Sequence, residues 1–113
     1  MRVSNLAATF VVLLLVFASQ PVPAQDRAAF EKALLLEEVQ AQYQEAISAY
    51  QEIVNDSADP AVAAQAQLHI GMCYEKLGLE KASLAYQKVI DEHPDSSFAD
   101  TAREAIKKLQ ANK

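Results

Sequence analysis

The sequence AISAYQEIV at residues 46–54 recurs as ASLAYQKVI at residues 82–90, which is 36 positions further along the chain. Six of the nine positions are identical or exchange only Ile and Val. A repeat of this period is typical of solenoids in which each unit contains two antiparallel helices. The two segments are therefore predicted to be one structural part used twice, the second helix of each of two units.

The surrounding sequence is helical in composition, and no stretch alternates like a strand. Asp59 before Pro60 forms a predicted N-cap, and Gly78 suits the left-handed residue after a helix. Ser97 and Asp100 have the spacing of a capping box. These signals predict helices at about 26–39, 42–55, 60–77, 80–92 and 96–110. The predicted fold class is all-α, a helical-hairpin solenoid of about two repeats plus a C-terminal capping helix.

The second unit resembles a tetratricopeptide repeat in the order of its small, aromatic and turn residues. The residues that carry this resemblance and the predicted repeat packing are Gly71, Tyr74, Gly78, Ala82, Tyr86, Val89 and Pro94. In the first unit, Ala46, Tyr50 and Ile53 match the second helix. Its first helix has Ala33 or Leu34 at the small position, Glu37 in place of the aromatic residue and Ala41 in place of the turn glycine.

Small residues at these positions also have a physical reason, because closely crossing helices need small side chains where their axes approach. Gly71, Ala46 and Ala82 meet that need, while Tyr50 and Tyr86 fill the space one turn along. The packing prediction therefore stands on steric grounds as well as on the resemblance.

The segment 94–102 is similar to the start of a unit in bacterial envelope members of this family. These members include the periplasmic coordinator of the Tol–Pal system and the lipoprotein of outer-membrane barrel assembly. The resemblance implies a bacterial protein that acts in cell-envelope assembly.

The first 24 residues have the layout of a secretory signal peptide. Arg2 precedes an apolar run from Leu6 to Ala18, and two prolines follow before Ala24. The run is shorter than the roughly 20 residues that a membrane-spanning helix needs, so cleavage is favoured over a retained anchor. We expect a signal peptide at 1–24 and a repeat domain at 25–113, exported to the periplasm, without a stable membrane span after cleavage.

The charge and cysteine content exclude several classes of function. Arg2 is the only charged residue among the first 24, so the remaining 89 residues carry 9 basic and 15 acidic side chains. Binding to nucleic acid needs clustered Lys and Arg, so no nucleic-acid partner is expected. The single cysteine excludes an internal disulfide and a multi-cysteine zinc site.

No constellation of residues predicts catalysis or a cofactor. His69 and Cys73 are one turn apart, but a metal site needs three or four ligands, so no metal is expected. Cys73 could be a buried core residue, half of an intermolecular disulfide or a nucleophile, and its apolar surroundings favour the core. Glu37 and Glu38 are adjacent and point about 100° apart on a helix, which does not suit acid–base catalysis. We therefore predict a protein that is not an enzyme and has no cofactor.

The remaining candidate is a binding surface for a protein or peptide. By the family pattern, the first helix of each unit lines a groove, and a peptide or helix would lie across the first, third and fifth helices. The predicted groove residues are Ala28, Glu31, Leu35, Glu38, Gln65, Leu68, Met72, Glu75 and Lys76. Two alternatives remain open: Leu68 and Met72 belong to the core, or the domain is an oligomerisation module, a homo-oligomer with no external ligand.

Overall fold

The computed structural model describes residues 22–78 and 80–113, and this part is mostly helical, without strands. The predicted signal peptide lies almost wholly outside the described residues. The elements are α2 (Ala24–Leu34), the π-helical turn η1 (Leu35–Val39), α3 (Tyr43–Asp56), α4 (Pro60–Lys76), α5 (Lys81–Glu92) and α6 (Ser97–Ala111). Each predicted helix is present, with ends within two residues of the prediction when η1 is counted with α2.

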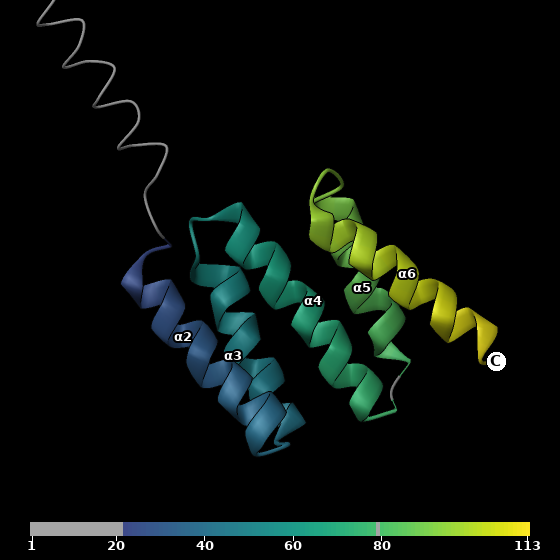
Figure 1. Cartoon of the computed structure of the whole chain (residues 1–113), viewed down its shortest axis with the longest axis horizontal. Coiled ribbons are helices and arrows are strands. Elements are labelled where there is room, and N and C mark those ends of the chain that lie inside the picture. Colours follow the sequence, from purple (N-terminus) through teal and green to yellow (C-terminus); the bar gives the residue numbers. More distant parts are fainter. Residues whose placement is uncertain (1–21, 79) are drawn as a thin grey trace, which may run out of the picture.

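Consecutive helices run in alternating directions and form two hairpins followed by α6 (Figure 1). The first hairpin is α2 with α3, and the second is α4 with α5. Helix α4 packs against both α3 and α5, and α6 packs against α5 (Figure 1). This arrangement is the predicted solenoid of two helical hairpins with a terminal helix, so the fold class is confirmed.

The helix starts follow local hydrogen-bond chemistry. Asp59 Oδ1 accepts a hydrogen bond from the backbone N–H of Ala61 at 3.0 Å, so the N-cap predicted for α4 is confirmed. The capping box predicted at the last helix is wrong. Ser96 is the N-cap, because its extended backbone places Oγ 3.1 Å from the N–H of Phe98.

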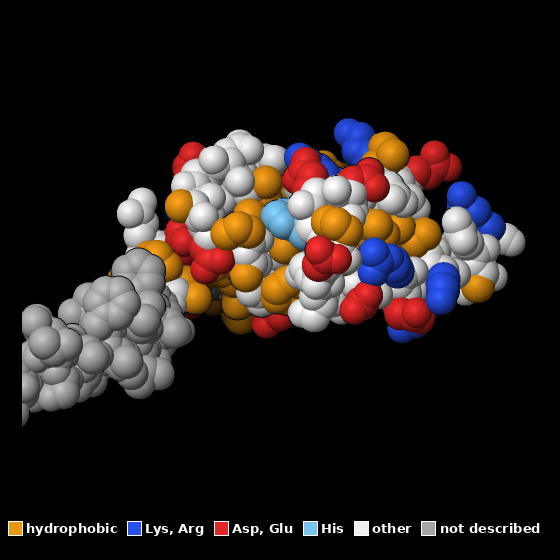
Figure 2. All heavy atoms as spheres, turned by 90° about the horizontal axis from the view of Figure 1, so that it is seen from above, with side chains coloured by type: hydrophobic (Ala, Val, Ile, Leu, Met, Phe, Trp, Pro, Cys, Tyr) orange, Lys and Arg blue, Asp and Glu red, His pale blue; other side chains and the backbone are white. Residues whose placement is uncertain are grey.

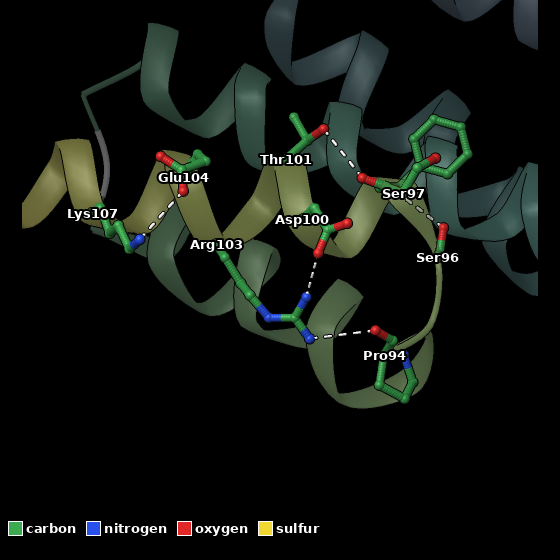
Figure 3. A network of polar contacts seen from close by, with 9 residues as sticks. Pro94, Ser96, Ser97, Asp100, Thr101, Arg103, Glu104 and Lys107 are labelled. Carbon is green, nitrogen blue, oxygen red and sulfur yellow. Dashed lines mark hydrogen bonds and ion pairs between the residues drawn. The ribbon is translucent and has the colours of Figure 1, made fainter.

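The outward side of α6 carries a chain of polar contacts (Figure 3). Arg103 donates to Asp100 Oδ1 at 2.7 Å and to the carbonyl of Pro94 at 3.3 Å, and Lys107 pairs with Glu104 at 3.3 Å. A solenoid needs a polar outer side on its terminal helix. These ion pairs give α6 that side, in agreement with a capping helix.

The core consists of two apolar clusters that meet at α4. One cluster joins the first hairpin to α4 and includes Ala46, Tyr50 and Ile53. The other joins α4, α5 and α6 and includes Ala82, Tyr86 and Val89. Most of the residues predicted to pack between helices are buried, namely Ala46, Tyr50, Gly71, Ala82 and Tyr86. Tyr74 is half-buried, and Gly78 and Pro94 lie exposed in turns.

Gly71 shows why the crossing of α4 and α5 needs a very small residue. A Cβ atom built at Gly71 would lie 2.6 Å from two ring carbons of Tyr86, Cδ1 and Cε1. Tyr86 is itself almost fully buried, so its ring has no free space to move into. The ring of Tyr86 therefore packs directly over the backbone of α4.

The two hairpin turns both contain a residue with left-handed backbone. Gly78 has φ of 68°, as predicted, and Ala41 has φ of 51°. Ala41 therefore stands in the position of the turn glycine, as the sequence indicated. It does so in a conformation that L-residues with a Cβ adopt at a free-energy cost.

Candidate functional site

A hollow of about 230 Å³ lies between the N-terminal halves of α2 and α4. Phe30 and Val62 are its apolar lining residues near the core, and Arg27, Glu31 and Gln65 provide polar groups around them. The full set of lining residues is Val22, Asp26, Arg27, Phe30, Glu31, Val62 and Gln65. Two predicted groove residues, Glu31 and Gln65, thus line the same hollow, which α6 does not reach.

The predicted groove register on α2 is wrong by one residue. Ala33 is fully buried and occupies the small position, whereas Leu34 only packs against the edge of the core. Leu35 is 47% exposed, lies outside the core cluster and does not line the hollow between α2 and α4. Each step along a helix turns a side chain by about 100°, so the corrected register brings Phe30 and Leu34 to the side facing the core.

The predicted groove residues on α4 divide between the core and the surface. The alternative that Met72 belongs to the core is wrong, because Met72 is 36% exposed. Leu68 is only 7% exposed and packs with α5 and α6, so its prediction as a groove residue is wrong and the core alternative is confirmed for this residue. Its side chain fills the space between three helices. Met72, Glu75 and Lys76 are exposed, as are Ala28 and Glu38 on α2 and η1.

Beneath the groove, a polar cluster joins three helices. The hydroxyl of Tyr50 on α3 donates to Glu37 Oε1 at 2.7 Å, and His69 Nδ1 on α4 donates to the same oxygen at 2.8 Å. The Tyr50 oxygen also lies 3.3 Å from His69 Nδ1. Glu37 is in η1 and only 7% exposed. Its carboxylate is therefore a buried acceptor that two helices share.

Aromatic rings enclose this cluster. Phe30 meets the rings of Tyr50 and His69 edge to face, with centroids 5.4 Å apart in both pairs. The rings of Tyr50 and His69 are stacked with centroids 5.0 Å apart. Since Phe30 also lines the hollow between α2 and α4, the cluster lies directly behind the groove.

The cluster determines the ionisation of its members. Burial raises the pKa of the Glu37 carboxyl, but the hydrogen bonds from His69 and Tyr50 outweigh burial and hold this pKa below 4.5. Burial and the neighbouring Glu37 carboxylate raise the pKa of Tyr50 far above its usual value. Glu37 is therefore a carboxylate at neutral pH, and Tyr50 remains a donor.

The second repeat contains the equivalent pair without the histidine. The hydroxyl of Tyr86 on α5 donates to Glu75 Oε2 on α4. Burial and this hydrogen bond raise the pKa of Tyr86. Glu75, unlike Glu37, is exposed. The tyrosine–glutamate contact is thus a feature of both hairpins, and only the first encloses it.

This cluster was not predicted from the sequence. Glu37 stood there in place of the aromatic residue, and His69 was considered only with Cys73 as an incomplete metal site. A signal was present, because each tyrosine follows a glutamate of the preceding helix, at 13 positions for Tyr50 and 11 for Tyr86. Without the register of α2, that spacing could not be interpreted.

Cys73 belongs to the core. It is fully buried and reduced, and burial together with the Glu37 charge raises its thiol pKa to about 12. The thiolate form is therefore strongly disfavoured. In residues 22–78 and 80–113, no group of three or more His, Cys, Asp and Glu side chains is arranged to hold a metal ion.

Comparison with protein families finds a repeat family that matches the chain twice. The model of the tetratricopeptide repeat matches residues 27–59 and again residues 65–96. The two matches begin 38 positions apart, so Ala33 corresponds to Gly71 and Glu37 to Glu75. This is the register that the buried residues of α2 show. Among curated proteins and among solved structures, no relative matches.

None of the helices in residues 22–78 and 80–113 is both long enough and apolar enough to cross a membrane.

Proposed function

Since this chain belongs to the tetratricopeptide repeat family, we propose that it is an exported adaptor that binds a peptide or protein segment between α2 and α4. The observation that carries the proposal is the hollow of about 230 Å³ formed by the first helices of the two repeats. Tetratricopeptide repeats are typically non-catalytic scaffolds, which agrees with a binding role.

The lining of the hollow indicates what it would bind. Phe30 and Val62 offer an apolar surface for one side chain of the ligand, and Gln65 can both donate and accept hydrogen bonds at the edge. The carboxylates of Asp26 and Glu31 lie at the same edge. A segment with an apolar side chain next to backbone or basic groups fits this lining.

The buried cluster supports this site by holding its walls in place. Glu37, Tyr50 and His69 connect η1, α3 and α4 through hydrogen bonds of 2.7 to 2.8 Å to one carboxylate oxygen. A binding surface held rigid before the ligand arrives loses less conformational entropy on binding. The cluster therefore positions the groove and does not itself contact the ligand.

Site-specific crosslinking tests the binding function. A photoreactive residue at Gln65 in the groove should capture a partner, whereas the same residue at Lys108 on the outer side of α6 should not. For the purified partner, Gln65→Trp should weaken binding at least about tenfold by filling the hollow. Gln110→Trp on α6 is the matched control. Equal binding by both tryptophan variants would contradict the groove.

A charge introduced at Leu68, one of the predicted groove residues, would test the fold and not the groove. Leu68 is buried between three helices, so a glutamate there would place an unpaired charge in the core and unfold the domain. Loss of binding would then report loss of the fold.

Export to the periplasm and a role in envelope assembly form the finer part of the proposal. They rest on the layout of residues 1–24 and on the similarity of residues 94–102 to bacterial envelope proteins. The amino-terminal residue of the protein recovered from cells tests export. We expect Gln25, and recovery of a chain that begins at Met1 would count against cleavage.

A further inference from the structure

Corresponding exposed positions in the two repeats carry opposite charge. Helix α3 presents Glu45, Ser48 and Glu52, which we call the acidic ridge. Helix α5 presents Lys81, Leu84 and Lys88 at the same positions of the repeated segment, which we call the basic ridge. Both ridges are exposed, and no ion pair within the described part of the chain involves their four charges.

The two ridges also match in spacing. In each, the charged residues are seven positions apart, which is about 10 Å along a helix. If one ridge packed against the other, two Glu–Lys ion pairs could therefore form at the same time. The match holds only in the parallel register in which Glu45 meets Lys81 and Glu52 meets Lys88.

The ridges are complementary in shape as well. Leu84 stands out from the basic ridge with 73% of its surface exposed, while Ser48 in the acidic ridge is small. Beside the basic ridge lies a hollow of about 270 Å³ whose lining includes Ile70 and Tyr74 of α4 and Gln51 of α3. A large side chain can therefore pack against a small one, with room for a helix alongside.

We propose that this face docks a second copy of the chain, so that the acidic ridge of each copy packs on the basic ridge of the other. Helices α3 and α5 run in the same direction, one on each side of α4 (Figure 1). A twofold axis along these helices then lays α3 parallel to α5 of the partner, and α5 parallel to its α3. Glu45 meets Lys81 of the partner subunit and Glu52 meets Lys88 of the partner subunit, each pair twice.

The charge distribution over the whole chain favours this pairing. Residues 27–59 contain two basic and seven acidic side chains, whereas residues 60–113 contain seven of each. In Figure 2 the Lys and Arg side chains gather over the half of the molecule that continues toward the C-terminus. Two copies related by the proposed axis would place the acidic repeat of each beside the more basic repeat of the other, which favours encounter.

The proposed face differs from the other surfaces of the molecule. Helices α2 and α4 line the groove of the proposed function, so a dimer through α3 and α5 leaves that groove open. Four charges on the outer side of α6 are already paired with each other, as Arg103–Asp100 and Lys107–Glu104, which disfavours stacking of copies end to end (Figure 3).

Charge reversal tests the dimer directly. The mass of the purified chain is measured by sedimentation across concentrations and salt, for the parent and for two double variants, Lys81→Glu/Lys88→Glu and Glu45→Lys/Glu52→Lys. The parent should have twice the mass of a single purified chain and should be more dissociated at high salt. Each double variant should dissociate at least about tenfold more readily, because like charges then face each other.

Mixing separates the proposal from a simple loss of fold. An equimolar mixture of the two double variants should form a heterodimer. The variant Lys81→Glu/Lys88→Glu has two acidic ridges and the variant Glu45→Lys/Glu52→Lys has two basic ridges, so each ridge again meets one of opposite charge. Lys107→Glu/Lys108→Glu on α6 is the control with the same change of net charge as Lys81→Glu/Lys88→Glu, and it should remain a dimer. A parent that stays monomeric, double variants that dimerise like the parent, or a mixture that remains monomeric would each overturn the proposal.

Discussion

The two repeats use the same contact in different surroundings. Tyr50 and Tyr86 each donate a hydrogen bond from the second helix of a hairpin to a glutamate of the first. In the first repeat the acceptor, Glu37, is buried and also bonded to His69, whereas in the second it is the exposed Glu75. The glutamate at this repeat position is therefore part of the core in one hairpin and lies on the surface in the other, depending on whether a third side chain encloses it.

The largest loss of stability is expected from a substitution at the small residue in the first helix of a hairpin, where α4 carries Gly71. Gly71→Ala should lower the free energy of unfolding by about 2–3 kcal/mol, because the new methyl group overlaps the buried Tyr86 ring. In the first repeat the same position already holds alanine, at Ala33. Chemical denaturation measures the difference.

The matched change in the first repeat is Ala33→Gly. It should lower stability by only about 1 kcal/mol, through helix propensity and a small void. If Gly71→Ala were as stable as the parent, the close approach of α4 and Tyr86 would be wrong.

The next difference concerns the two glutamates. Glu37→Leu should destabilise the protein by about 1–2 kcal/mol, because the buried Tyr50 hydroxyl and His69 lose their acceptor. Glu75→Leu should cost less, about 0.5–1 kcal/mol, because only one donor, the Tyr86 hydroxyl, loses its acceptor and Glu75 itself is exposed. Adding Tyr50→Phe to Glu37→Leu should recover part of the loss. Equal effects of the two leucine variants would show that burial does not separate the repeats.

The first repeat should also respond to acid. The pKa of Glu37 is held below 4.5 in the folded protein, so its contribution to stability is complete above that pH and is lost as the pH falls below it. Glu37→Gln should therefore flatten the decline of stability with falling pH. Tyr50→Phe removes one of the hydrogen bonds that lower this pKa, so the part of the decline that Glu37 causes should be smaller than in the parent. Unfolding curves between pH 7 and pH 3 measure both effects.

Much of the fold could be predicted from the sequence, because it depends on local signals. The repeated segment fixed two helices by similarity, and Asp59–Pro60 and Gly78 marked boundaries through their own backbone chemistry. The N-cap of α6 was missed by one residue. Ser96 and Ser97 are neighbours with the same side chain, and only the backbone angles distinguish the cap from the first helical residue.

The site was less predictable, because it depends on helix rotation. Glu37, Tyr50 and His69 come from three helices, and a shift of one residue in α2 turns Glu37 away from the other two. The sequence left Ala33 and Leu34 as alternatives for the small position, so the rotation stayed open. Leu68 was ambiguous for the same reason, since a leucine on a helix can face either a groove or a third helix.

Small effects of single substitutions are expected at the two hairpin turns, and there the first repeat is the less favourable one. Ala41 and Gly78 both have positive φ, but only glycine adopts this conformation without steric cost. Ala41→Gly should raise the free energy of unfolding by about 0.5–1 kcal/mol, and Gly78→Ala should lower it by about 1 kcal/mol. A Cβ atom at Gly78 would have no atom within 4 Å, so that loss is conformational and not a clash. The double variant should then unfold close to the parent, whereas destabilisation by Ala41→Gly would show that the turn of the first hairpin depends on the alanine methyl group.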